Sequence, residues 1–309
     1  MDLQRSEDRC WSLFEGMAAQ SASVLAHRAA MVNADACEWL SHVPAQTIHA
    51  VVTDPPYGLV EYGDTDHEKM RNGNGGVWRI PPSFDGATRS PVPRFTVLSA
   101  HDRSNLSRFF REFAALLLRV LVPGGHVFVA SNPLVSTTTF GAFEEAGFEK
   151  RGEIIRLVQT LRGGDRPKGA EDEFPDVTVM PRSCWEPWGL FRKPFDGTVA
   201  ENLRSWGAGA LRRTSVREPF RDVITCSPTR APERDIAPHP SLKPQRFLRR
   251  IVRAALPLGV GIVLDPFAGS GSTVAAAAAV GYAALGVERD RQYYEMALSA
   301  FAQLRDLEV

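Results

Sequence analysis

The chain has 309 residues, of which 44% are hydrophobic and 23% charged, and its formal net charge at pH 7 is zero. These proportions are typical of a soluble globular protein, and 25 glycines and 4 cysteines are too few for a collagen-like or disulfide-rich scaffold. No apolar stretch is long enough to cross a membrane, and the N-terminus lacks the basic start and apolar core of a secretion signal. We therefore expect a cytoplasmic protein without membrane contacts. Since the cysteines form no CxxC pair and lie at no zinc-finger spacing from histidine, we also expect reduced thiols and no metal site.

Charge is distributed unevenly along the chain. Residues 1–70 carry 4 basic and 11 acidic side chains, whereas residues 182–253 carry 15 basic and 7 acidic ones. Such an asymmetry is typical of a protein with one side that faces a polyanion. A solvated arginine-rich surface would have the same composition, so the charge distribution alone does not show that the protein binds nucleic acid.

Strand and helix patterns alternate in the first half of the chain. Residues 48–52 are a continuous apolar run, which predicts a buried strand that ends at the prolines of Asp54-Pro55-Pro56-Tyr57. Residues 58–103 are rich in Gly, Pro, Asn and Asp and predict a long loop. Apolar side chains at helical spacing predict a helix over residues 105–121, which Pro123-Gly124-Gly125 ends. Strand, helix and strand patterns follow at 126–130, 140–146 and 153–160.

An irregular segment separates these patterns from a regular C-terminal part. Residues 161–236 are rich in proline, arginine and tryptophan, and we expect an irregular insert there, with two of Trp185, Trp188 and Trp206 in the core. Helix, strand, helix, strand and helix patterns then follow at 247–255, 261–265, 272–281, 283–288 and 292–304. Alternating strands and helices at both ends predict an α/β fold with a doubly wound, mostly parallel sheet.

A glycine-rich turn joins the predicted strand 261–265 to the helix after it. In the sequence Asp265-Pro266-Phe267-Ala268-Gly269-Ser270-Gly271, the two glycines allow a tight turn and the close approach of a ligand. Glu288 ends the next strand, where a carboxylate can bind ribose hydroxyls. The turn lacks the lysine of a P-loop and has Val274 where a dinucleotide fingerprint has its third glycine. A nucleoside ligand without a pyrophosphate fits better.

The motif Asp54-Pro55-Pro56-Tyr57 lies at the carboxyl end of its strand, where open α/β sheets bind ligands. The prolines leave backbone carbonyls without a partner in the sheet, so a carboxylate and a carbonyl can accept both hydrogens of one amino group. Such bonds orient the nitrogen lone pair for attack on an electrophile. Tyr57 offers a face on which an unstacked base can lie.

These motifs resemble those of the DNA amino-methyltransferases. Asp54-Pro55-Pro56-Tyr57 resembles the catalytic motif of that family, residues 265–271 resemble its S-adenosylmethionine motif, and His239-Pro240-Ser241-Leu242-Lys243-Pro244 resembles the segment before it. Asn33-Ala34-Asp35-Ala36-Cys37 resembles the segment that contacts adenine. The catalytic motif comes first, as in the beta group, a circular permutation of the usual methyltransferase. The resemblance covers roughly residues 31–160 and 237–305.

The resemblance implies a role for each matching residue. The target base would be held by Asp54, Pro55, Pro56 and Tyr57. The adenine of S-adenosylmethionine would meet Asp35 and Ala36, its ribose Glu288, and its methionine part Ser241 and Lys243. The rest of the cofactor site would be Asp265, Phe267, Gly269, Gly271 and Ser272. The strands that end at Asp54 and Asp265 should then be parallel neighbours.

The resemblance also predicts three parts of the chain. Residues 1–160 would be the catalytic half of the methyltransferase domain, residues 161–236 an inserted target-recognition region and residues 237–309 the cofactor-binding half. The arginines and tryptophans of the insert suit phosphate contacts and base stacking.

The resemblance implies methyl transfer from S-adenosylmethionine to an exocyclic amine in double-stranded DNA. Adenine is the expected base, because Asp in the first motif position favours adenine in this family. The cytosine amine and a catalytically silent DNA-binding subunit are the alternatives. The sequence leaves open whether the protein forms a homodimer and whether a restriction endonuclease is its partner.

Overall fold

The structure is a computed structural model, which describes residues 22–26, 28–56, 83–84, 87–88, 99–158, 167, 169–179, 181, 184–239 and 241–309. Its main sheet consists of β1 (Ala22–Ala26), β2 (Ala29–Asn33), β3 (Ile48–Thr53), β6 (Leu121–Ala130), β7 (Glu149–Leu157), β8 (Trp185–Arg192), β9 (Val223–Thr225), β10 (Ile262–Asp265) and β11 (Ala283–Glu288). The short strands β4 (Ser83–Phe84) and β5 (Ala87–Thr88) pair with each other. The helices are α2 (Ala36–His42), α4 (Ala100–Val120), α5 (Ser136–Glu145), α6 (Val199–Trp206), α7 (Ala231–Ile236), α8 (Gln245–Ala255), α9 (Ser272–Ala279) and α10 (Arg291–Asp306).

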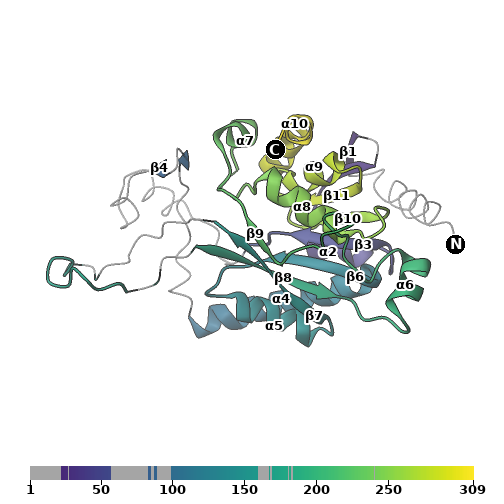
Figure 1. The fold of residues 1–309 in the computed structure, drawn as a ribbon, viewed down its shortest axis with the longest axis horizontal. Coiled ribbons are helices and arrows are strands. Elements are labelled where there is room, and N and C mark those ends of the chain that lie inside the picture. The colour runs from purple at the N-terminus through teal and green to yellow at the C-terminus, as the bar shows by residue number, and fades with distance from the viewer. Residues whose placement is uncertain are drawn as a thin grey trace.

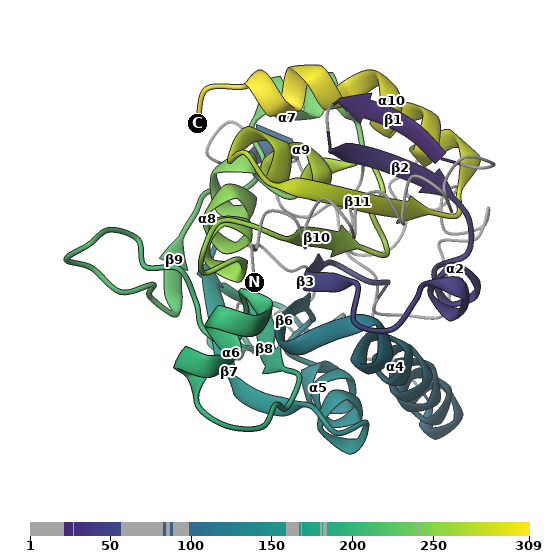
Figure 2. The same ribbon diagram turned by 90° about the vertical axis from the view of Figure 1, so that its right-hand side faces the viewer.

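Both ends of the chain contribute to this one sheet, whose order is β1-β2-β11-β10-β3-β6-β8-β7-β9 (Figures 1 and 2). The five strands from β2 to β6 in that order are parallel to one another, and β7 is parallel to β9. Strand β1 is antiparallel to β2, and β8 is antiparallel to both of its neighbours. The expected α/β fold with a mostly parallel sheet is confirmed.

Helices cover both faces of the sheet. In Figure 1, α4 and α5 lie below it and α8, α9 and α10 above it. Strand β3 is buried along its whole length, and its side chains alternate between the two cores: Val51 packs on the side of α4, and Val52 on the side of α8. Because the middle of α9 is a run of buried alanines, this helix lies close to the sheet and shapes the turn before it.

The structure differs most clearly from the expected elements in three places. Helix α4 begins at Ala100 rather than at residue 105, within the segment 58–103 that was expected to be a loop and most of which lies outside the described residues. Strand β6 begins at Leu121 and runs through Pro123-Gly124-Gly125, the residues expected only to end the preceding helix. The segment 161–236, expected to be irregular, contains β8, which lies inside the sheet between β6 and β7. Its apolar residues explain this position, since Trp188 and Phe191 are fully buried. The expectation that two of the three tryptophans lie in the core is wrong, because Trp206 is half-buried and Trp185 is exposed.

Candidate active site

The carboxyl ends of β3 and β10 lie side by side. The two strands are parallel, with Val263 opposite Ala50 and Leu264 opposite Val51, so the expected neighbourhood of Asp54 and Asp265 is confirmed. The Thr53 hydroxyl donates a 2.7 Å hydrogen bond to Asp265 Oδ1. A pocket opens at this edge, and it is lined by Asp54, Trp188, His239, Ser241, Leu242, Lys243, Leu248, Asp265, Phe267, Ala268, Gly269, Ser270, Ser272 and Thr273.

Asp265 is the buried start of the glycine turn. Its Oδ1 accepts the 3.2 Å bond from the backbone N–H of Phe267 as well as the bond from Thr53. Burial raises the pKa of this carboxyl to about 6, although hydrogen bonds from Thr273 and Thr53 oppose the shift. The Asp54 carboxylate adds to the rise. Two acidic groups therefore lie close together on one side of the pocket.

The turn after Asp265 requires glycine at two positions. Gly269 and Gly271 have φ values of +50° and +76°, in the left-handed region that favours glycine. A Cβ atom at Gly269 would lie 3.0 Å from His239 Nε2. Gly271 is the N-cap of α9, so the turn directs the positive end of this helix toward the pocket.

Glu288 holds the turn in place. The N–H of Gly269 donates to Glu288 Oε2 at 2.8 Å, and the N–H of Asp290 donates to Oε1 at the same distance. Burial raises the pKa of Glu288 despite these bonds. The carboxylate lies beside the turn rather than on the wall of the pocket described above.

Asp35 and Ala36 lie at the end of the neighbouring strand. Asn33 of β2 is the register partner of Glu288 in β11, and its side chain donates to the Glu288 carbonyl at 2.8 Å. Asp35 is the N-cap of α2, where its Oδ1 accepts from the N–H groups of Cys37 and Glu38. Ala36 is buried in the first turn of that helix. The tertiary fold thus brings Asp35 and Glu288 to one edge of the sheet.

The motif that begins at Asp54 is described as far as Pro56. Pro55 is buried and Pro56 is exposed, whereas Tyr57 lies outside the described residues. Asp54 is half-buried and forms an ion pair with Lys243. The structure therefore brings Lys243 to the Asp54 carboxylate, a contact that the resemblance did not predict.

One hydrogen bond lies within the segment before α8, and another ties the start of α8 to the start of α9. The Ser241 N–H donates to His239 Nδ1 at 3.2 Å, and the buried Gln245 donates from its side chain to the Ser272 carbonyl at 2.8 Å. Burial, together with the Lys243 ammonium, lowers the pKa of His239 to about 4, so this ring is neutral at pH 7. Lys243 lines the same pocket as the glycine turn.

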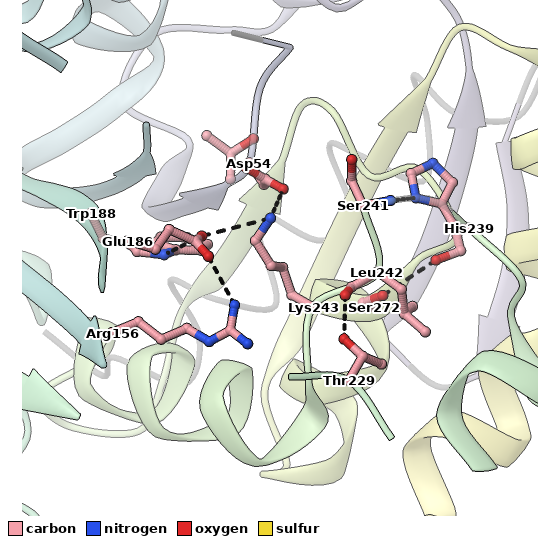
Figure 3. A network of polar contacts seen from close by, with 12 residues as sticks. Asp54, Arg156, Glu186, Trp188, Thr229, His239, Ser241, Leu242, Lys243 and Ser272 are labelled. Carbon is pink, nitrogen blue, oxygen red and sulfur yellow. Dashed lines mark hydrogen bonds and ion pairs between the residues drawn. The ribbon is translucent and has the colours of Figure 1, made fainter. Parts of the chain in front are cut away.

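A second carboxylate lies behind Lys243. Figure 3 shows the ammonium between Asp54 and Glu186, with Nζ at 3.6 Å from Glu186 Oε1. Burial alone would raise the pKa of Glu186, but the charges of Lys243 and Arg156 outweigh it and lower the pKa. Glu186 and Arg156 were missed by the sequence reasoning. No local signal distinguished Arg156, because β7 carries four other charged residues, whereas Glu186 stood out only as an acid in a mostly apolar stretch of β8.

Comparisons with known proteins find similarity to DNA methyltransferases. A family model described as DNA methylase matches residues 187–299. The chain is 24% identical to the Type II methyltransferase M.HindIII of Haemophilus influenzae over 86% of its length and 93% of the relative. It is 25% identical to the Type II methyltransferase M2.DpnII of Streptococcus pneumoniae over 86% of its length and 87% of the relative.

Solved structures share the fold. TTHA0409 of Thermus thermophilus, a candidate DNA modification methylase solved with S-adenosyl-L-methionine, aligns with a TM-score of 0.52 at 22% identity, covering 89% of this chain and 95% of that one. The PvuII DNA methyltransferase, which is cytosine-N4-specific, aligns with a TM-score of 0.55 at 14% identity, covering 90% and 86%. At this identity the likeness concerns the fold.

Proposed function

We propose that this chain, a member of the DNA amino-methyltransferase family, transfers a methyl group from S-adenosylmethionine to the exocyclic amine of adenine in double-stranded DNA. The observation that carries the proposal is the shared edge of β3 and β10. There the Asp54 motif and the glycine turn, which are about two hundred residues apart, line one pocket. A methyl donor in the turn and an amine at Asp54 would lie within reach of each other.

The residues present fit the cofactor. The turn offers a glycine backbone and a helix N-terminus, and Phe267 forms an apolar wall that packs on Phe113 at 5.1 Å between ring centroids. We propose that Glu288 binds the ribose, that Asp35 and Ala36 meet the adenine, and that Ser241, Lys243 and Ser272 lie near the methionine part. When bound, S-adenosylmethionine supplies a methyl group on a positively charged sulfur, and the negative charges of Asp54 and Asp265 suit that charge.

Asp54 has the central role in the reaction. Its carboxylate accepts one hydrogen of the target amine and the carbonyl of the proline segment accepts the other, which makes the conjugated nitrogen a better nucleophile. The amine would attack the methyl carbon directly as the methyl–sulfur bond breaks, and the methylated amine would then lose one proton to water, so no nucleophilic side chain is required. A base inside a duplex must be flipped out to reach the pocket, and Tyr57 would stack on it.

The choice of adenine rests on Asp54 as the first residue of its motif. The fold does not discriminate between bases, since it is shared with a cytosine-N4-specific enzyme. Cytosine therefore stays the second candidate. The Type II methyltransferase names of the relatives favour a role in restriction–modification with an endonuclease partner, and we propose a cytoplasmic location.

We propose residues 161–236 as the target-recognition region, between a catalytic half at 1–160 and a cofactor half at 237–309. Strand β8 belongs to the sheet, so the region that contacts DNA would be the part of this segment outside the strand.

Transfer of tritiated methyl groups to genomic DNA from a host without this modification tests the proposal. We expect label in N6-methyladenine, and loss of turnover by a factor of about a hundred or more in Asp54→Ala. Glu144→Ala, which changes an exposed carboxylate of α5 outside the pocket and outside the proposed target-recognition region, is the control. Label in N4-methylcytosine would keep the mechanism and replace the base, whereas full activity of Asp54→Ala would refute the proposed reaction.

A further inference from the structure

Four alternating charges run from the pocket into the sheet. Arg156 Nη1 donates to Glu186 Oε2 at 2.8 Å, Lys243 Nζ lies 3.6 Å from Glu186 Oε1, and the same ammonium is bonded to Asp54 Oδ2 (Figure 3). The side chains of Arg156 and Lys243 are 6% and 14% exposed, and those of the two acids 15% and 19%. Two cations and two anions balance one another where little water reaches them.

Glu186 is held rigidly from behind. The Trp188 indole donates to Oε1 at 2.9 Å, and Arg156, which is also bonded to the Ser227 carbonyl at 3.2 Å, holds Oε2. Both donors lie on strands of the sheet. Lys243, in contrast, reaches the site from a loop on a flexible four-carbon stem. The acceptor is fixed, and the ammonium is the part that can move.

The Lys243 ammonium, in its present position, competes with the proposed role of Asp54 as an acceptor for the target amine. The proposed reaction needs the Asp54 carboxylate as an acceptor for the target amine, yet Oδ2 already accepts from Lys243. A carboxylate that holds an ammonium is a weaker acceptor for a neutral amine. A shift of less than about 1 Å would bring Nζ within ordinary hydrogen-bond distance of Glu186 Oε1.

We propose that Glu186 is a positioning residue that draws the Lys243 ammonium away from Asp54 when the target amine enters the pocket. The inference rests on the proposed function and adds to it a residue of β8. Glu186 lies behind Lys243 and acts through it, while Arg156 and Trp188 keep Glu186 in place. The ammonium keeps a carboxylate partner throughout, so the shift leaves no unpaired cation in the buried site.

Glu186→Gln tests the proposal, because the amide keeps the shape and an oxygen for Trp188 but loses the charge. We expect turnover at saturating cofactor to fall on the order of tenfold or more, because the ammonium then stays on Asp54. At saturating cofactor, which offsets the loss of Lys243 from the proposed methionine site, the double variant Glu186→Gln/Lys243→Met should turn over faster than Glu186→Gln, because no ammonium competes for Asp54. If Glu186 only supported the fold, the double variant would be slower than either single variant.

The matched control is Glu149→Gln. Glu149 of β7 accepts from Arg192 of β8 at 2.5 Å, so this variant also removes a carboxylate from an arginine pair of the same two strands, but away from the pocket. We expect wild-type turnover. If thermal melting shows that Glu186→Gln does not fold, Glu186→Asp keeps the charge and shortens the reach, and its smaller loss should also be relieved by Lys243→Met.

The outcomes separate this inference from the function on which it rests. Wild-type turnover in Glu186→Gln, or a double variant slower than Glu186→Gln, would overturn the role of Glu186 while Asp54→Ala stays inactive. A wild-type protein that methylates none of the genomic DNA would instead refute the proposed function itself.

Discussion

Thr53 and Asp265 are 212 residues apart in the chain, and inside the core the hydroxyl of the first donates a 2.7 Å hydrogen bond to the carboxylate of the second. Both side chains are buried, and each ends its strand. The residue after Thr53 is Asp54, and Asp265 begins the glycine turn. This bond therefore joins the two motifs that the proposed reaction needs at one point.

Thr53→Val should weaken both the fold and the cofactor site. Removal of the hydroxyl leaves the buried Asp265 with one donor fewer, which should lower the free energy of unfolding by about 1–3 kcal/mol in urea denaturation. Calorimetry should show weaker binding of S-adenosylmethionine. Thr47→Val is the control, because its buried hydroxyl donates to the Pro44 carbonyl at 2.8 Å, far from the turn. Equal cofactor affinity in the two variants would show that the hydrogen bond from Thr53 to Asp265 does not support the cofactor site.

Glu288→Ala should weaken cofactor binding by about 1–3 kcal/mol, the usual loss for a hydrogen bond to a charged group. The carboxylate holds the Gly269 N–H in this structure and is the proposed ribose ligand. Glu295→Ala removes an exposed carboxylate from α10 and should leave the affinity unchanged. Calorimetric titration with S-adenosylmethionine measures the affinity of both variants. An unchanged affinity in Glu288→Ala would show that Glu288 does not bind the cofactor.

Asp265 should make the protein less stable as the pH rises from about 4 to about 6.5. Its pKa is raised to about 6 in the folded state and is about 3.9 when unfolded, so in this range the folded state binds more protons. The stabilisation is present below pH 4 and lost as the pH passes 6. Over this range the free energy of unfolding of the wild type should fall by up to about 3 kcal/mol relative to Asp265→Asn.

Asp102→Asn is the control with the opposite sign. Hydrogen bonds from Ser99 lower the pKa of Asp102, so its stabilisation is lost as the pH falls. Urea denaturation at several pH values measures both variants. Parallel curves for the wild type and Asp265→Asn would show that the carboxyl of Asp265 titrates normally.

Residues 182–253, which carry the excess of basic side chains, are called the basic segment here. DNA binding should depend on the exposed arginines of this segment rather than on all of its arginines. Arg249 and Arg253 donate to backbone carbonyls, at 2.9 Å to Arg305 and 2.7 Å to Arg213 respectively, and so support the fold. The exposed ones to test are Arg217, Arg246 and Arg250. Changing these three to glutamine should weaken binding to all sequences and reduce the salt slope by about one unit for each lost phosphate contact.

A triple variant on the other face controls for total charge. Arg103, Arg108 and Arg111 are exposed on α4, across the sheet from α8, and their change to glutamine should leave the salt slope unchanged (Figure 1). Fluorescence anisotropy with duplex DNA at several salt concentrations measures both variants. Equal salt slopes in the two triple variants would show that the arginines of the basic segment are solvated and do not contact DNA.

The sequence by itself determined the elements whose signals are local. The apolar runs of β3, β10 and β11 and the helical periodicity of α4, α8 and α10 predicted these elements to within a few residues, except for the start of α4. The glycine turn was readable because positive φ values require glycine at particular positions. The pairing of β3 with β10 was predicted from the resemblance of the two motifs, and of their order, to those of the DNA amino-methyltransferases.

Only the tertiary structure decided which distant side chains meet. Strand β8 looked irregular because its tryptophans and proline interrupt the expected alternation, yet packing on both faces places it in the sheet. The contacts among Lys243, Asp54 and Glu186 join three segments that no local pattern relates, and the same holds for the arginines that bond inside the fold. Strand order and register depend on how both faces of the sheet are packed, so these contacts exist only once the core has formed.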